Sequence, residues 1–175
     1  MAADSSGPEA LPPYTYVPGG PWPHPRSSPQ GHSAGALPPR AEPIKEGNWA
    51  ASAEYLRGAA LFNAGYYWEA HEAWEALWHA HGRHGPTADL LRALIKLAAA
   101  GVKVREGQPH GITVHAGRAQ AIFEAVRAEV GRSYLGLDLD DLISQARRIT
   151  EEPPRDPSPP GSSVVRVFGF AIDPL

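Results

Sequence analysis

The stretch LFNAGYYWEAHEAWEALWHAHGR, residues 61–83, decides the fold because it holds the end of one amphipathic helix and all of a second. Over residues 66–81, apolar and aromatic side chains recur every three or four positions, as on one face of a helix. This stripe consists of Tyr67, Ala70, His71, Trp74, Leu77, Trp78 and His81. The preceding helix begins near Trp49 and ends where Gly65 can adopt the left-handed conformation that closes a helix. The sequence therefore predicts two antiparallel helices joined by a tight turn.

Three more amphipathic helices are predicted after this hairpin. The third is capped by Thr87 and runs to about Arg105, the fourth has Pro109 in its first turn, and the fifth is capped by Asp138. Their buried faces are, in order, Leu91, Leu94, Ile95, Ala98 and Val102; Ile112, His115, Ala119, Ile122, Val126 and Val130; Leu139, Leu142, Ile143, Ala146 and Ile149. The fold class is therefore all-α, a compact bundle of about five helices.

Proline-rich arms flank the predicted bundle. We expect an extended arm over residues 1–47, a helical domain over 48–150, and a linker with a short apolar segment over 151–175. The N-terminal arm carries aromatic side chains that can dock on a folded body, and docking and a free arm both remain open. The segment VVRVFGFAI, residues 164–172, has the composition of a short strand. We favour an extended strap on the body over pairing with another chain.

Composition narrows the range of partners and sites. The net charge is −3 and the pI is about 6.2, so the chain lacks the basic surface that phosphate backbones require, and we expect no nucleic-acid partner. No apolar run is long enough for a membrane span, and the first residues do not resemble a signal peptide, so we expect a cytoplasmic protein without membrane contact. With no cysteine, a metal site would need histidine and carboxylate ligands.

The first candidate site lies on the second helix. His71 and Glu75 are four residues apart, so their side chains lie on one helix face and can share a metal ion or a proton. The alternative is a purely structural hydrogen bond between the two. The pattern His-Glu-x-x-Glu differs from the zinc-protease motif His-Glu-x-x-His in its last ligand, and Glu is a harder donor.

His115 is the natural third member of this group, because its position on the fourth helix also faces inward. A set of His71, Glu75 and His115 would suit zinc, iron or manganese. A structural role for His115, covering a polar gap near the end of the bundle, is the alternative.

The string Leu61 to Arg83 resembles the signature of the DUF309 family, small helical proteins of uncharacterised function. LIKLAAAGVKVREG, residues 94–107, and YLGLDLDDL, residues 134–142, resemble the family's third and closing helices. The residues that carry the signature are Phe62, Asn63, Gly65, Tyr67, Glu69, His71, Glu72, Trp74, Glu75 and Trp78. The resemblance spans about residues 50–150 and implies a bundle that begins with a tetratricopeptide-like hairpin. It implies no reaction.

This chain departs from the family pattern in the third helix. It has Lys96 where many members carry Gln, and Lys103 where a His often follows. Any chemistry that depends on that His is therefore in doubt for this chain.

These observations favour a binding module with a polar groove between helices for a small polar ligand or a peptide. The predicted groove residues are Asn63, Tyr67, His71, Glu72, Glu75 and Lys96. A second hypothesis is a metal-dependent hydrolase with a divalent ion on His71, Glu75 and His115 and with Glu72 as general base. A third is a structural protein whose arms bind a neighbouring subunit in a homo-oligomer.

Overall fold

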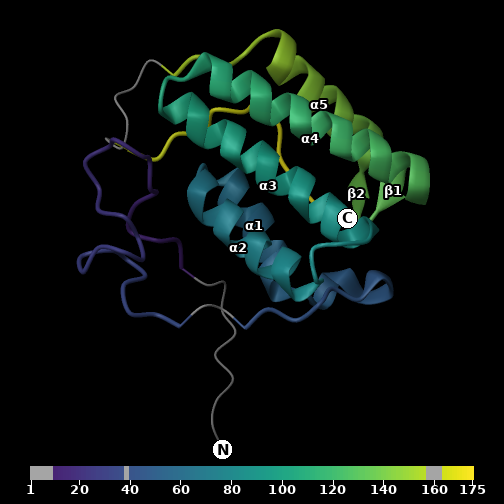
Figure 1. Cartoon of the computed structure of the whole chain (residues 1–175), viewed down its shortest axis with the longest axis horizontal. Coiled ribbons are helices and arrows are strands. Elements are labelled where there is room, and N and C mark those ends of the chain that lie inside the picture. Colours follow the sequence, from purple (N-terminus) through teal and green to yellow (C-terminus); the bar gives the residue numbers. More distant parts are fainter. Residues whose placement is uncertain (1–9, 38–39, 157–162) are drawn as a thin grey trace, which may run out of the picture.

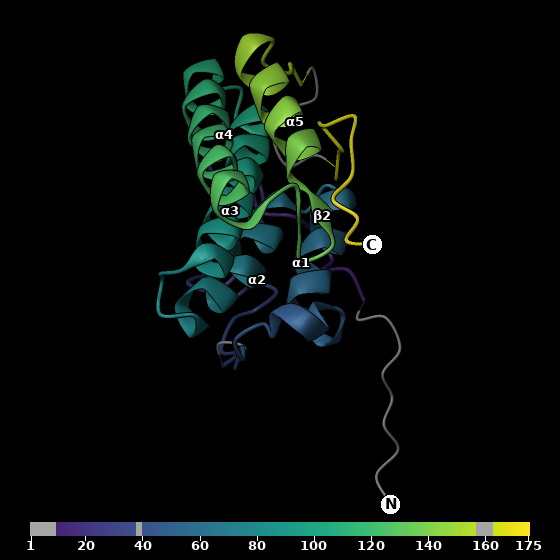
Figure 2. The same cartoon turned by 90° about the vertical axis from the view of Figure 1, so that its right-hand side faces the viewer.

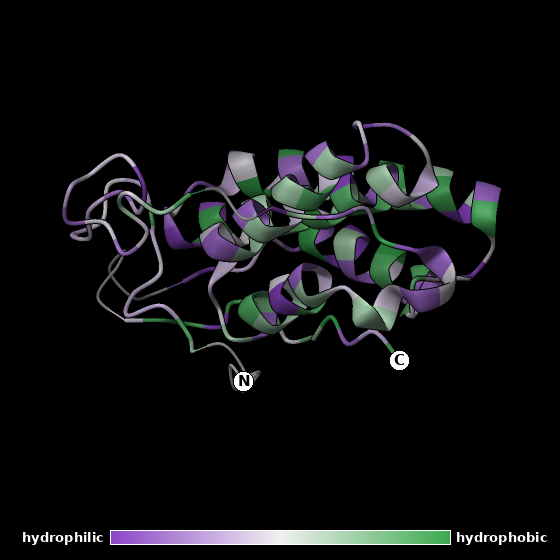
Figure 3. Ribbon diagram, turned by 90° about the horizontal axis from the view of Figure 1, so that it is seen from below, coloured by the Kyte–Doolittle hydropathy of each residue, from purple (hydrophilic) through white to green (hydrophobic). Residues whose placement is uncertain are grey.

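The computed structural model describes residues 10–37, 40–156 and 163–175 (Figure 1). The elements are η1 (Glu46–Ala51, a 3-10 helix), α1 (Ala53–Asn63), α2 (Tyr67–Ala80), α3 (Pro86–Arg105), α4 (Pro109–Val130), β1 (Ser133–Tyr134), β2 (Leu137–Asp138) and α5 (Leu139–Glu151). The predicted all-α bundle is confirmed, with α3 lying between the α1–α2 hairpin and α4 (Figure 1). Each helix carries both hydrophilic and hydrophobic residues, as an amphipathic bundle requires (Figure 3).

A glycine on each neighbouring helix allows α2 to pack closely. A Cβ atom at Gly58 of α1 would lie 2.2 Å from Nε1 of Trp74, and one at Gly101 of α3 would lie 2.6 Å from Cγ of Tyr67. Trp74 is fully buried and its indole N–H donates to the carbonyl of Tyr55. These contacts fix the position of α2 along both of its neighbours.

The ends of the helices follow local chemistry. Gly65 has φ of +90° in the α1–α2 turn, as expected from its place after the helix. Asp138 caps α5 as predicted, because its carboxylate accepts from the amides of Asp140 and Asp141. The prediction that Thr87 caps α3 is wrong. The helix starts one residue earlier, at Pro86, whose fixed φ suits the first helical position.

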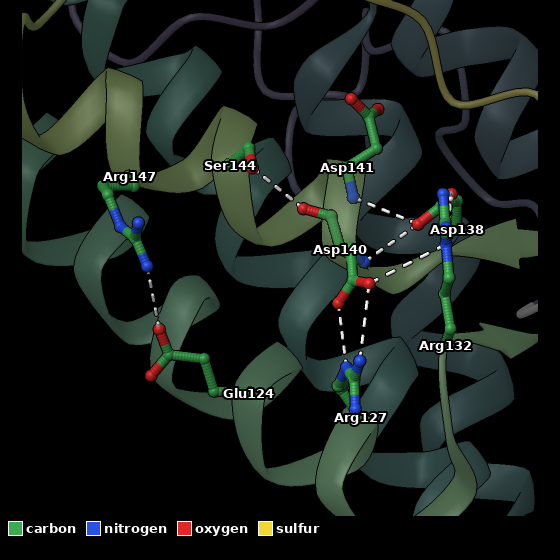
Figure 4. Close-up of polar contacts among 8 residues, drawn as sticks. All are labelled: Glu124, Arg127, Arg132, Asp138, Asp140, Asp141, Ser144 and Arg147. Atoms are coloured by element: carbon green, nitrogen blue, oxygen red, sulfur yellow. Dashed lines mark hydrogen bonds and ion pairs between the residues drawn. The ribbon is translucent and has the colours of Figure 1, made fainter.

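An unpredicted hairpin joins α4 to α5. Strands β1 and β2 pair antiparallel across a two-residue turn in which Leu135 and Gly136 both have positive φ. Exposed ion pairs run alongside it: Arg127 bonds Asp140, and Arg132 bonds Asp138 (Figure 4). Because all these charges are exposed, the ion pairs contribute little to the free energy of unfolding. The apolar contact between α4 and α5 contributes most of the stability at this end of the bundle.

The C-terminal segment 163–175 lies extended against the body (Figure 2). The segment pairs with no strand, and side chains of the α1–α2 hairpin hold it as an extended strap. The side-chain amide of Asn63 donates to the carbonyl of Ile172 at 3.0 Å and accepts from its amide at 2.7 Å. The hydroxyl of Tyr67 accepts from the amide of Val167 at 2.8 Å. Phe168 and Ile172 are buried, so the segment completes the apolar core.

Within the described residues, no helix is long and apolar enough to cross a membrane.

Replacing Asn63 with Ala should destabilise the protein by about 1–3 kcal/mol, because the buried Ile172 amide loses its acceptor. Urea unfolding measures this loss, and hydrogen exchange should show faster exchange at the Ile172 amide. Asn48→Ala, on the exposed face of η1, serves as the control and should stay within about 0.5 kcal/mol of wild type. Equal stability of the two variants would contradict the assigned role of Asn63.

A second prediction concerns pH and His81, whose Nε2 accepts from the Ile44 amide at 2.8 Å. Burial lowers the pKa of His81 below 6.5, against a smaller opposing effect of Glu46. As the pH falls, His81 of the unfolded chain therefore binds a proton more readily than His81 of the folded chain. The contribution of His81 to the free energy of unfolding is thus present above about pH 6.5 and is lost as the pH falls below it. Between pH 7.5 and 5.5, His81→Ala should lose less stability than His110→Ala, measured by urea titrations at about five pH values. Parallel curves for the two variants would refute this account.

Candidate functional site

The polar residues of α2 form two groups. In the first group, Glu69 and Oε2 of Glu72 face the N-terminal arm. In the second group, His71, Glu75 and Oε1 of Glu72 lie on the neighbouring, half-exposed face of the helix. Glu72 thus belongs to both groups. The inward face of α2 is apolar and holds the helix in the bundle.

Glu69 anchors the N-terminal arm. It is 6% exposed, and its Oε2 accepts from the hydroxyl of Thr15 at 2.6 Å. Its Oε1 accepts from the amide of Tyr16 at 3.0 Å and lies 3.1 Å from Nε2 of His32. A buried carboxylate is stable only when such partners replace its water, so docking of the arm and burial of Glu69 depend on each other.

Aromatic and ionic contacts extend this attachment. The rings of Tyr16 and His24 pack edge-on against Trp68 of α2. Nε of Arg26 lies 3.2 Å from Oε2 of Glu72. The described part of the arm therefore contacts Trp68, Glu69 and Glu72 of α2.

A pocket of about 430 Å³ lies between the arm and the α1–α2 hairpin. Its lining comprises Pro12, Arg26, His32, Ser33, Ala53, Glu54, Arg57, Leu61, Trp68, Glu69, Glu72 and Ala73. The volume is that of a small-molecule site. The charges of Glu69 and Glu72 are already engaged by the arm, so the pocket offers few free polar groups for a ligand.

The second group brings three metal-binding side chains together. Nδ1 of His71 lies 3.6 Å from Oε1 of Glu72 and 4.0 Å from Oε2 of Glu75. The three donor atoms all lie within 4.8 Å of one another. Nδ1 of His71 is buried and has no hydrogen-bond partner, although the side chain as a whole is 29% exposed. A buried nitrogen without a partner is uncommon and calls for an explanation.

The electrostatics of the group keep Glu72 ionised. The neighbouring His71 lowers the pKa of Glu72 most, and Arg26 lowers it further, against the opposing effect of burial. Glu72 is therefore a charged carboxylate at neutral pH, the form that binds cations.

The structure divides the predicted groove residues. His71, Glu72 and Glu75 lie together, whereas Asn63 and Tyr67 hold the C-terminal segment. This division shows that the helical signature combines residues with different roles.

Two further predicted residues lie outside this group. Within the described part of the chain, Lys96 forms no ion pair with Glu72 or with Glu75. His115 is not among the three grouped donors. Burial, followed by Lys96, Lys103, Arg118 and His71, lowers the pKa of His115, so His115 lies within electrostatic range of the site.

Sequence reasoning did not identify Glu69, Arg26 or His32 as partners. The arm has no periodic pattern, so nothing in the sequence aligns its residues with positions on α2. The available signal was the carboxylate of Glu69 at a position next to the apolar stripe.

One family model matches part of the helical bundle. Residues 55–114 match the model of DUF309, a domain of unknown function, which confirms the resemblance over that segment. No curated protein matched the chain. The match covers most of α1, all of α2 and α3 and the start of α4, including all three grouped donors.

Replacing Glu69 with Ala should release the arm and cost about 2–4 kcal/mol, because Thr15 and Tyr16 lose a charged acceptor. Limited proteolysis should then cut within residues 10–37 faster than in wild type. Glu151→Ala, an exposed helix-end carboxylate, is the control and should leave both the cleavage rate and the stability unchanged. Unaltered cleavage in Glu69→Ala would count against the anchor.

Proposed function

We propose that this chain, which carries a DUF309 domain over residues 55–114, is a binding module whose site is the His71, Glu72 and Glu75 group and whose ligand is a divalent metal ion. The observation that carries the proposal is the buried Nδ1 of His71, which has two carboxylates beside it and no hydrogen-bond partner.

The spacing of the donors supports a common ion. Metal–ligand distances of about 2.0–2.2 Å place neighbouring donors roughly 3–4 Å apart. The separations of 3.6 and 4.0 Å from His71 match this range after small side-chain adjustments. One imidazole and two carboxylates suit zinc, manganese or iron.

The exposure of the group supports a binding role. The side chains of His71, Glu72 and Glu75 are 29%, 26% and 38% exposed, so a bound ion would keep coordination positions open on the solvent side. A small polar ligand could complete the coordination there. In our proposal the predicted small polar ligand therefore binds at this site through the metal ion.

The contacts of Glu72 favour binding over hydrolysis. Its Oε1 faces His71 and its Oε2 pairs with Arg26, which supports a role as metal ligand. A general base needs an oxygen free to take a proton from water. The hydrolase with His115 as third ligand stays a prediction, and so does a role of the arms in a homo-oligomer.

Isothermal titration with Zn²⁺ and with Mn²⁺, after removal of bound metal by chelator, tests the proposal. We expect one ion per chain. In His71→Ala and in Glu75→Gln the affinity for the ion should fall at least about tenfold below wild type, because each variant removes one of three ligands. His84→Ala is the matched control, since His84 is exposed and bonded to the carbonyl of Gly82. Equal affinity in wild type and His71→Ala for both ions would overturn the proposal.

A further inference from the structure

The N-terminal arm forms a layer outside the hydrophobic core. Its most buried apolar side chains, Tyr14 and Val17, do not belong to the cluster of buried residues that fills the bundle. Phe168 and Ile172 of the C-terminal segment do belong to that cluster. Most of the arm, purple in Figure 1, stands beside the helices. The core of the bundle is therefore closed without the arm.

The arm is folded largely on itself. The ring of Tyr14 stacks on that of Trp22 with 5.0 Å between centroids, and the Tyr14 hydroxyl donates to a carbonyl of the arm and accepts from one of its amides. Ile44, which follows the arm, is buried in the core, and its amide donates to His81. Release of residues 10–37 would therefore stop at Ile44 and leave the bundle in place.

The α1–α2 hairpin contacts the backbone of the arm at two points. On α1, Nη2 of Arg57 donates to the carbonyl of Ala10 at 2.8 Å. On α2, Oε1 of Glu69 accepts from the amide of Tyr16 at 3.0 Å. Contacts with main-chain groups do not depend on the side chains of the bound segment, and they supply affinity in several modes of peptide recognition. Residues 10–16 thus lie on the hairpin as a bound peptide lies in a groove.

Three further contacts select the side chains of that segment. The hydroxyl of Thr15 donates to Glu69 at 2.6 Å, and the ring of Tyr16 packs edge-on against Trp68. Pro12 lines the pocket of about 430 Å³. A proline-containing segment is extended before it binds, so its docking loses little conformational entropy. The hairpin therefore recognises an extended, proline-containing segment in which a hydroxyl residue precedes an aromatic residue.

Charge adds a further preference. The hairpin side of the pocket carries three carboxylates, Glu54, Glu69 and Glu72, and one cation, Arg57. The arm complements this surface with Arg26, whose Nε lies 3.2 Å from Glu72. A segment that replaces the arm is therefore favoured by a basic residue. The open volume of the pocket leaves room for larger side chains than the arm supplies.

We propose that the face of the hairpin around Arg57, Trp68 and Glu69 is a docking surface for an extended segment of another protein. That segment contains proline, a hydroxyl residue followed by an aromatic residue, and a basic residue. The arm occupies the surface within its own chain, so it must leave before the partner binds. The docking surface needs no metal ion.

The experiment uses the full chain, in the presence of chelator, and a peptide with the sequence of residues 10–18 and a fluorescent label at its N-terminus. The double variant Thr15→Val, Arg26→Gln loosens the arm and leaves every hairpin residue unchanged. The peptide should bind this double variant at least about tenfold more tightly than the wild type, because the arm of the wild type holds the site. Fluorescence anisotropy measures the affinity, and circular dichroism checks that each variant is folded.

Variants of the hairpin locate the site. Added to the double variant, Glu69→Gln and Arg57→Gln should each weaken peptide binding by about tenfold. Arg92→Gln is the matched control, since Arg92 is exposed on α3 and paired with Asp89. A peptide with valine in place of Thr15 keeps the shape and loses the hydroxyl, so it should also bind about tenfold more weakly.

Absence of binding to the double variant, or equal affinity for the double variant and the wild type, overturns the proposal. So does equal peptide affinity in Glu69→Gln, Arg57→Gln and Arg92→Gln. Sedimentation of the protein alone supplies the last outcome. Dimers of the wild type that the double variant does not form would assign the surface to the arm of a second copy and overturn the proposal of a separate partner. Because chelator is present, these outcomes are independent of whether the metal site exists.

Discussion

The rest of the structure depends on the direct contact of two aromatic rings of α2 with the backbones of its neighbours. Trp74 occupies the space that a side chain at Gly58 would fill, and Tyr67 does the same at Gly101. Any Cβ at either glycine would push the helices apart, so α2 has one rotation and one height in the bundle. That single setting turns Glu69 toward the arm and leaves His71 on the half-exposed face with Glu72 and Glu75, and the polar chemistry of the molecule follows from it.

The helices were predictable because each buries a continuous apolar face whose period is visible in the sequence. The cap at Asp138 was predictable for a similar reason, since a short side chain and nearby amides are all that a cap needs. Thr87 was misassigned because Pro86 competes for the same helix start. Residues 164–172 have the composition of a strand but lie as an extended strap, since composition favours an extended backbone and does not supply a partner strand.

The candidate site was predictable only where its members share a helix. The spacing of His71 and Glu75 determines that they meet, and they do. The roles of Asn63 and Tyr67 depend on a segment about a hundred residues away, and that of Glu69 on an arm more than thirty residues before it. Contacts between a helix and an irregular segment have no period, so sequence reasoning assigned Asn63 and Tyr67 to a ligand and gave Glu69 no partner.

Arg105 gives the C-terminal part of the chain a further property. Its guanidinium bonds Asp156 and also the carbonyl of Ser163, so the two residues that border 157–162 are held at one point. Because this guanidinium is itself buried at the end of α3, it fixes the place from which residues 163–175 reach the α1–α2 hairpin. Loss of this one side chain would therefore loosen the C-terminal segment at the end opposite to Asn63 and Ile172.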